Sequence, residues 1–132
     1  MNKEKLDLIN TYIKAGITNI LLEDVDANVI KNAVILESNC DIKDLNGHYE
    51  GLDFLPPNWY KELISKDSKN PILIINNLNK IKTEEQRKFI EILKYNKIST
   101  FDLPKNCIVI MITNNLLQNP INEEVYSLLA HI

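Results

Sequence analysis

Cysteines and long apolar runs are scarce in this chain of 132 residues. Cys40 and Cys107 allow at most one disulfide, and because the N-terminus carries no secretory leader, reduced thiols in a cytoplasmic protein are the expected state. The longest apolar runs, such as 108–112, are far shorter than the roughly 20 residues of a membrane-spanning helix. The sequence therefore predicts neither a disulfide scaffold nor a membrane protein.

An excess of positive charge is also missing, since 15 basic residues stand against 18 acidic ones and the formal net charge is −3. Proteins that bind nucleic acid through its phosphates usually present a cationic face and a basic pI, so nucleic acid is not expected as the main partner. A nucleic-acid module stays open as a third hypothesis, because one group of cations is dense. The cations are Lys80, Lys82, Arg87 and Lys88, and Glu84, Glu85 and Glu91 lie among them. The whole group is expected to form a solvated helix face.

Glycine is rare as well, with only Gly16, Gly47 and Gly51, each placed where it can end a helix or form a turn. A loop that cradles phosphates needs glycines directly after a strand, and none lies between Gly16 and Gly47. The chain length fits one domain, residues 1–132, whose core needs no disulfide or metal.

Helical and strand-like patterns alternate along the chain and predict an α/β fold with a mainly parallel sheet of about four to five strands. An apolar stripe with helical spacing covers 3–15, and Gly16 is the expected stop. Strand-like apolar runs lie at 18–22, 72–75 and 107–113, the last two of the kind that is buried on both faces. The apolar run at 33–36 fits either a helix or a strand.

The connecting segments are more polar. Residues 39–51 are rich in turn formers, with Asp41 and Asp44 among them, and are predicted as a loop. Pro57 suits the first position of a short helix that ends near Lys66. Thr83 and Gln86 match a capping box, which predicts a helix from there to about Tyr95.

Asparagines follow the two most apolar strands, at the strand ends where ligands bind in parallel α/β sheets. Asn76 and Asn77 come directly after one run, and Asn114 follows the other. With the predicted helix between them, residues 70–115 resemble the second half of the ATPase core of the AAA+ family. In that family an acidic pair follows the first strand and a sensor asparagine follows the second, so Asn76 and Asn77 stand in place of the pair and Asn114 in place of the sensor.

An upstream segment narrows the resemblance to the MoxR-like branch of that family. The stretch DIKDLNG at 41–47, followed by Gly51 and by LPPNWY at 55–60, is similar to the loop and the "pPeW" helix start of the branch. The similarity runs from about Cys40 to the C-terminus. It implies a compact three-layer, P-loop-like fold, with ATP and magnesium as the ligands of the family.

The chain departs from the family wherever hydrolysis needs a particular side chain. The phosphate loop supplies a lysine for the phosphates and a serine or threonine for magnesium, and Lys31 and Asn32 are the nearest counterparts. The acidic pair would hold the metal and polarise water. Its replacements, Asn76 and Asn77, are amides that cannot take a proton from water near neutral pH.

The spacing of the elements and the count of arginines also argue against ATP hydrolysis. Eighteen residues separate Leu22 from Asp41, whereas a phosphate loop, its helix and a return strand together need roughly 25 or more, so the loop is predicted to be deleted. The inter-subunit arginine of the family matches about Leu128, and the only arginine of the chain is Arg87. The helical lid of the family would lie beyond Ile132.

Several polar residues carry two open interpretations. Because the chain holds 18 asparagines, Asn76, Asn77 and Asn114 are either ordinary loop residues or the remains of a nucleotide-binding site. His48 and His131 have no evident cysteine, serine or carboxylate partner and are not expected to act in catalysis or to bind zinc. Trp59 and Cys107 are expected in the core.

Together these features predict a non-catalytic pseudo-ATPase module that acts in protein interaction or assembly, without a catalytic residue, a metal or a cofactor. The expected partner is a protein, either an intact AAA+ subunit or a second copy of this chain. The alternative is an active MoxR-like AAA ATPase that binds and hydrolyses ATP with magnesium and a partner subunit.

Overall fold

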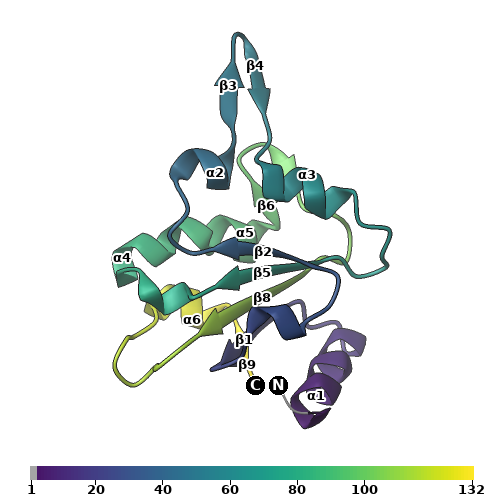
Figure 1. The fold of residues 1–132 in the computed structure, drawn as a ribbon, viewed down its shortest axis with the longest axis vertical. Coiled ribbons are helices and arrows are strands. Elements are labelled where there is room, and N and C mark those ends of the chain that lie inside the picture. Colours follow the sequence, from purple (N-terminus) through teal and green to yellow (C-terminus); the bar gives the residue numbers. More distant parts are fainter. Residues whose placement is uncertain (1–2) are drawn as a thin grey trace.

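A five-stranded parallel sheet forms the centre of the computed structural model, which describes residues 3–132 (Figure 1). The strand order is β2-β5-β8-β1-β9, and every neighbouring pair is parallel. The predicted α/β fold with a mainly parallel sheet is confirmed, and the ambiguous run at 33–36 is a strand. The bounds are β1 Asn19–Glu23, β2 Ala33–Glu37, β5 Ile72–Asn76, β8 Ile108–Thr113 and β9 Ala130–His131.

The two most apolar strands, β5 and β8, are neighbours in this sheet, as the sequence predicts. Their pairing runs from Ile72 opposite Ile108 to Ile75 opposite Met111. Every residue of β8 is buried, which explains its uninterrupted apolar run, since a central parallel strand is covered on both faces. Because all strands run the same way, their last residues meet at one border of the sheet, here called the carboxyl edge.

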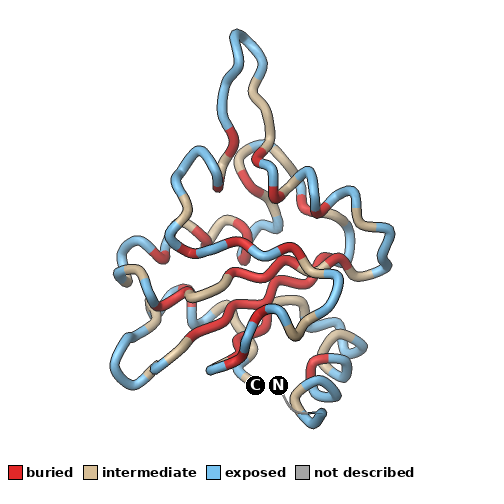
Figure 2. The backbone as a smooth tube through the Cα atoms, viewed as in Figure 1, coloured by how far each residue is buried: buried red, intermediate tan, exposed pale blue. Residues whose placement is uncertain are grey.

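One face of the sheet, the α5 face, carries most of the helices and the larger core. Leu21, Leu73, Ile75, Val109 and Met111 of the strands belong to this core. Figure 2 shows the buried stretches of the central strands in red. The helical elements that cover it are α2 Ile42–Asn46, α3 Asn58–Ile64, η2 Leu78–Lys80, α4 Thr83–Gln86, η3 Arg87–Phe89, α5 Ile90–Tyr95 and α6 Glu123–Ser127. The expected core residues Trp59 and Cys107 both belong to this larger cluster.

The opposite face, the α1 face, is covered by helix α1 (Lys3–Lys14) and by the connection from β1 to β2, residues 24–32. Ile9 of α1 and Ala27 of the connection pack on Ile20, Ile74 and Ile110. Gly16 ends α1 with a φ of 85°, as expected. Within residues 3–132, no helix is long and apolar enough to cross a membrane.

The connection 24–32 holds one 3₁₀ turn, η1 (Ala27–Val29), and no α-helix. It leads from the carboxyl end of β1 past β8 and β5 to the start of β2, a displacement of about 22 Å by strand spacing and rise. Ten residue steps in an α-helix advance only about 15 Å, whereas the same steps extended reach about 33 Å. The connection is therefore too short to contain a phosphate loop and its helix.

The predicted loop at 39–51 is wrong, because this segment contains α2 and the first strand of a hairpin. The hairpin strands β3 (His48–Glu50) and β4 (Asp53–Leu55) are antiparallel, and the hairpin projects beyond the rest of the domain (Figures 1 and 2). An isolated two-stranded hairpin is marginal in water. Here a chain of ring contacts supports it, from Tyr49 to Phe54 and from Phe54 to Phe101, at centroid distances of 4.9 and 5.7 Å.

The predicted capping box at Thr83 is also wrong. The residue before α4 is Lys82, no side chain caps this helix, and the predicted helix 83–95 is divided by η3. Gln86 is fully buried, and its amide donates to the carbonyls of Ile81 and Pro120, both at 3.2 Å. Its side chain satisfies distant backbone groups and not its own helix start, so the local pattern was misleading. Pro57, similarly, precedes the first residue of α3.

We expect Gly47→Ala to lower the free energy of unfolding by about 3 kcal/mol. Gly47 has a φ of 96°, and an added Cβ would lie 2.3 Å from the carbonyl oxygen of Leu55. Gly51 has a φ of 62° with nothing within 4 Å, so Gly51→Ala should cost only about 1 kcal/mol. Urea unfolding followed by Trp59 fluorescence measures both, and equal losses would contradict the role given to the Leu55 contact.

The two thiols should react at very different rates. Burial raises the pKa of Cys107 to about 12, which leaves roughly one thiolate in ten thousand at pH 8. Partial burial also raises the pKa of Cys40, but this side chain is only half-buried. Iodoacetamide at pH 8, with mass spectrometry of the peptides, should label Cys40 at least about tenfold faster in the folded protein. In urea the two rates should converge, and fast native labelling of Cys107 would show that strand β8 is not closed.

Candidate functional site

The three predicted site asparagines, Asn76, Asn77 and Asn114, lie together at the carboxyl edge, joined through one carboxylate. The amides of Asn76 and Asn77 donate to the two oxygens of Glu37 at 2.9 and 3.0 Å. Asn114 in turn donates to the side-chain oxygen of Asn77 at 3.0 Å. We call these four residues the Glu37 network.

Glu37 is a residue of this network that no sequence motif singles out. It ends strand β2 and lies opposite Asn76 in the pairing with β5. Its contact with Asn77 joins residues 40 positions apart, so no local motif marks it. The apolar run 33–36 could have indicated Glu37, because a strand in that run places the next residue, Glu37, at the carboxyl edge.

The backbone around Asn77 is held by further hydrogen bonds. Asn77 has a left-handed φ of 55°, a conformation that asparagine tolerates well. The hydroxyl of Ser38 donates to the carbonyl of Asn77 at 2.6 Å. The side chain of Asn79 donates to the carbonyls of Asn114 and Asn119, in the loop after β8, at 2.7 and 2.8 Å. The loops after β5 and β8 are therefore bound to each other, which presents the amides in a fixed geometry.

A depression of about 310 Å³ adjoins the network. It is lined by Asn77, Asn79, Lys80, Asn114, Asn115 and Asn119. Amides and one ammonium group can form hydrogen bonds with a polar ligand, but none of them activates water near neutral pH. Among residues 3–132, no three histidine, cysteine or acidic side chains are grouped to hold a metal ion.

Lys31 and Asn32, the nearest counterparts of a phosphate loop's side chains, lie away from this edge. They directly precede Ala33, the first residue of β2, and therefore belong to the amino end of the sheet. The Glu37 network lies at the other end of the same strands. Neither side chain is placed to meet a ligand bound beside Asn77.

Arg87 is engaged away from the site, in an exposed ion pair with Glu124 at 3.1 Å. Leu128, which the resemblance matches to the family's arginine, is half-buried against the larger core. The prediction that the cations of 80–91 are balanced by the glutamates among them needs correction, because Arg87 pairs with Glu124 of α6. Lys88 donates to the carbonyl of Cys40, and Glu91 accepts from the amide of Ser99.

The expectation that His131 lacks a carboxylate partner is wrong. Its Nε2 lies 2.8 Å from a carboxylate oxygen of Glu23, and its Nδ1 lies 3.3 Å from the hydroxyl of Tyr126. These three residues come from β9, β1 and α6, so the contacts hold the two-residue strand β9 on the sheet. The contact between Glu23 and His131 joins residues 108 positions apart and depends on the pairing of β9 with β1, which no local pattern reveals. His48 has a more distant carboxylate, Glu50 at 3.5 Å.

We expect Asn77→Asp to lower the free energy of unfolding by about 1 kcal/mol at low salt. The variant replaces a donor to Glu37 by a second carboxylate at the same distance. Adding Glu37→Gln should recover most of the loss, because the glutamine amide can donate to the new aspartate. Asn106→Asp serves as the control, since Asn106 also has a positive φ, of 62°, and its side chain makes no hydrogen bond to residues 3–132. Unfolding in urea measures all four proteins, and a loss that Glu37→Gln does not reverse would contradict the network.

Searches with this chain against models of protein families and against curated proteins find no match. The geometry of the carboxyl edge and of the β1–β2 connection is therefore the basis for any statement about function.

Proposed function

We propose that this chain is a degenerate AAA+-like module of the MoxR-like type that does not hydrolyse ATP and acts in protein interaction or assembly. The connection 24–32 carries the proposal. It occupies the place between the first two strands where such an ATPase has its phosphate loop and helix, and ten residue steps are too few for both.

The Glu37 network gives independent support. Two amides stand where an ATPase would hold magnesium and polarise water, and both donate to Glu37. No cation of residues 3–132 forms an ion pair with this carboxylate, so the two amides are its hydrogen-bond partners. The side-chain amides of Asn76, Asn77 and Asn114 thus have hydrogen-bond partners within the protein.

One observation favours the alternative, an active ATPase that works with a partner subunit. The depression beside Asn77 and Asn114 lies at the carboxyl ends of parallel strands, where α/β proteins commonly bind ligands, and Lys80 contributes one positive charge to it. A phosphate cradle supplied by another subunit would have to approach the sheet at this depression.

Titration calorimetry with ATP and magnesium tests the proposal, together with steady-state hydrolysis. We expect no binding tighter than about 1 mM and no turnover above that of the buffer. The double variant Asn76→Asp, Asn77→Glu restores an acidic pair and should still show no turnover, because the connection 24–32 supplies no cradle. Micromolar binding with turnover that Asn77→Ala abolishes would reject the proposal in favour of the ATPase.

A further inference from the structure

The outer side of strand β2 is an open sheet edge. β2 ends the strand order, and among residues 3–132 the only strand paired with it is β5. Ser38 donates its amide to Asn76 of β5, and donors alternate along a parallel strand, so the amide and carbonyl of Ile35 face outward. No backbone hydrogen bond joins Ile35 to another segment of residues 3–132.

Natural proteins usually block such an edge with a lysine, a proline or a bulge. The sequence of β2 is AVILE, which contains none of these within the strand. Ile35 is 39% exposed, and its side chain continues the apolar surface of the α1 face. This strand therefore presents both unpaired backbone groups and an apolar side chain to an incoming segment.

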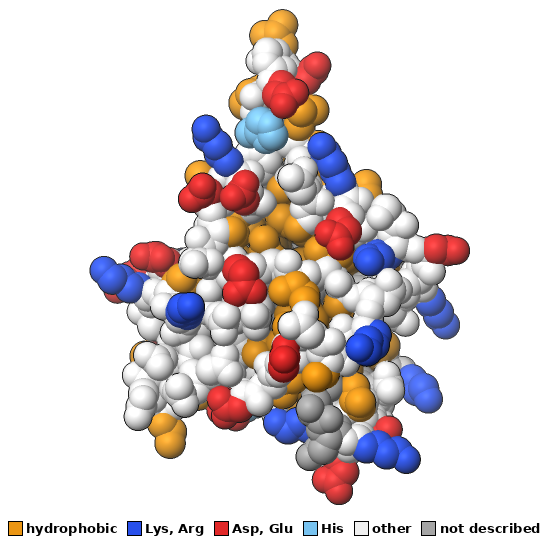
Figure 3. Space-filling model, viewed as in Figure 1, with side chains coloured by type: hydrophobic (Ala, Val, Ile, Leu, Met, Phe, Trp, Pro, Cys, Tyr) orange, Lys and Arg blue, Asp and Glu red, His pale blue; other side chains and the backbone are white. Residues whose placement is uncertain are grey.

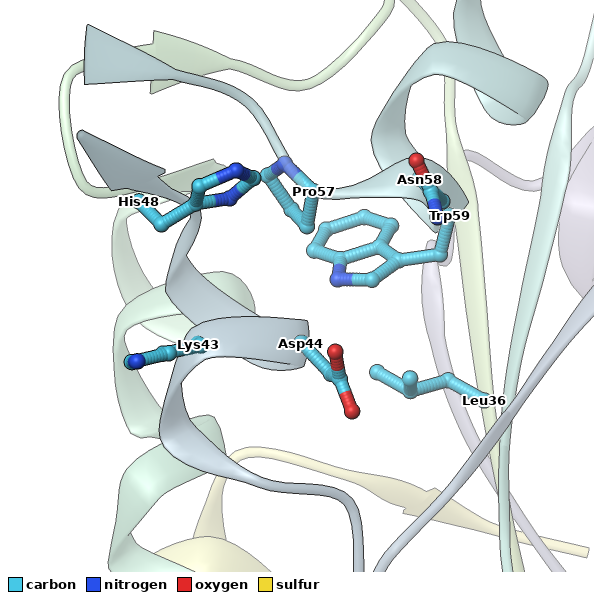
Figure 4. Close-up of a pocket in the computed structure, with 7 residues that line it drawn as sticks. All are labelled: Leu36, Lys43, Asp44, His48, Pro57, Asn58 and Trp59. Atoms are coloured by element: carbon cyan, nitrogen blue, oxygen red, sulfur yellow. The ribbon is translucent and has the colours of Figure 1, made fainter. Parts of the chain in front are cut away.

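A pocket of about 350 Å³ lies beside this edge, below the β3–β4 hairpin. Leu36 of β2, Pro57 and Trp59 supply its apolar surface, and Figure 3 shows the hollow on this face of the molecule with apolar side chains inside it. Leu36 points from β2 into the pocket (Figure 4). Side chains of a strand added beside β2 would alternate in the same way, and those on the Leu36 side would enter the pocket.

Asp44 is the one acidic residue that lines this pocket. In Figure 4 its carboxylate lies opposite Leu36 and Trp59, whereas Lys43 points away. Asp44 forms no hydrogen bond or ion pair with any residue from 3 to 132. The indole nitrogen of Trp59 already donates to the carbonyl of Leu45 at 3.0 Å, which fixes the ring beside the carboxylate.

We propose that an extended segment of a partner protein adds to the edge of β2 and inserts a lysine or arginine side chain into this pocket. The aliphatic stem packs on Trp59 and Pro57, and the charged group reaches Asp44. The two neighbouring residues of the segment face Ile35 and are apolar. This inference rests on the proposed function as a protein-interaction module and names the partner of that module by its chemistry: apolar, basic, apolar in one strand.

Fluorescence anisotropy with seven-residue labelled peptides provides the test. A peptide with a central arginine between two isoleucines should bind with a Kd of about 10–100 μM, and its central-glutamate counterpart at least about tenfold more weakly. N-methylation of the peptide amides that face β2 should abolish binding, while methylation of the alternate amides should leave it within about twofold. This pair of peptides separates strand addition from attraction by charge alone.

Asp44→Asn should weaken binding of the arginine peptide about fivefold to tenfold and remove the preference over glutamate. Asp41→Asn is the matched control, because Asp41 is an exposed aspartate next to α2 that does not line the pocket. It should change the affinity less than twofold. Both aspartates are exposed and neither carboxylate caps the helix, so the two variants are expected to fold.

Four results would overturn the inference: no binding of the arginine peptide below 1 mM, equal effects of the two methylation patterns, an Asp44→Asn variant that binds as well as its control, or a dimer of the free chain whose formation excludes the peptide from the β2 edge. The last result would identify a second copy as the occupant. None of these results bears on ATP binding or hydrolysis, so a failed peptide test leaves the proposed function in place. ATP turnover together with specific peptide binding would reject the proposed function alone.

Discussion

The length of the β1–β2 connection is the constraint on which the rest of the architecture depends. Because strands β8 and β5 lie between β1 and β2, the chain must cross much of the sheet in nine residues, 24–32. It can do so with the single 3₁₀ turn η1 but not as a continuous α-helix, whose ten steps would advance only about 15 Å, and such a segment covers less of the sheet than a helix would. Helix α1 supplies additional cover through Ile9, so the α1 face keeps a core, but a smaller one than the α5 face.

The same constraint determines what happens at the carboxyl edge. Without a glycine-rich loop there is no ring of backbone amides to neutralise an anion, and the polar side chains of neighbouring strands are left to satisfy one another. Glu37 from β2, Asn77 from β5 and Asn114 from β8 do so across three strands. An acidic residue at position 77 would place two carboxylates about 3 Å apart, so amide side chains at this edge are compatible with Glu37 in a way that an acidic pair is not.

The parts of the fold that the sequence predicted are those decided by long apolar patterns. The runs 72–75 and 107–113 could only be central strands, since a segment with no polar face must be covered on both sides. The failures fall where a local pattern is overruled by a distant partner: Gln86 matches a capping box but binds Pro120, and residues 39–51 look like a loop but form α2 and part of the hairpin. Glu37 and His131 depend on strand pairing between segments far apart in sequence, which no spacing rule contains.

The buried amides of Asn79 and Gln86 have a consequence for how this chain can change over evolution. Both side chains bind backbone groups of the segment 114–122, namely the carbonyls of Asn114, Asn119 and Pro120 and the amide of Asn122. Backbone groups are common to nearly all residue types, so the composition of residues 115–121 is free to drift while these contacts persist. The end residues are more restricted, because the side chain of Asn114 donates to Asn77 and that of Asn122 caps α6. An insertion or deletion would shift every one of these groups and leave buried amides without partners. The segment should therefore vary in sequence and stay constant in length, unlike an ordinary surface loop.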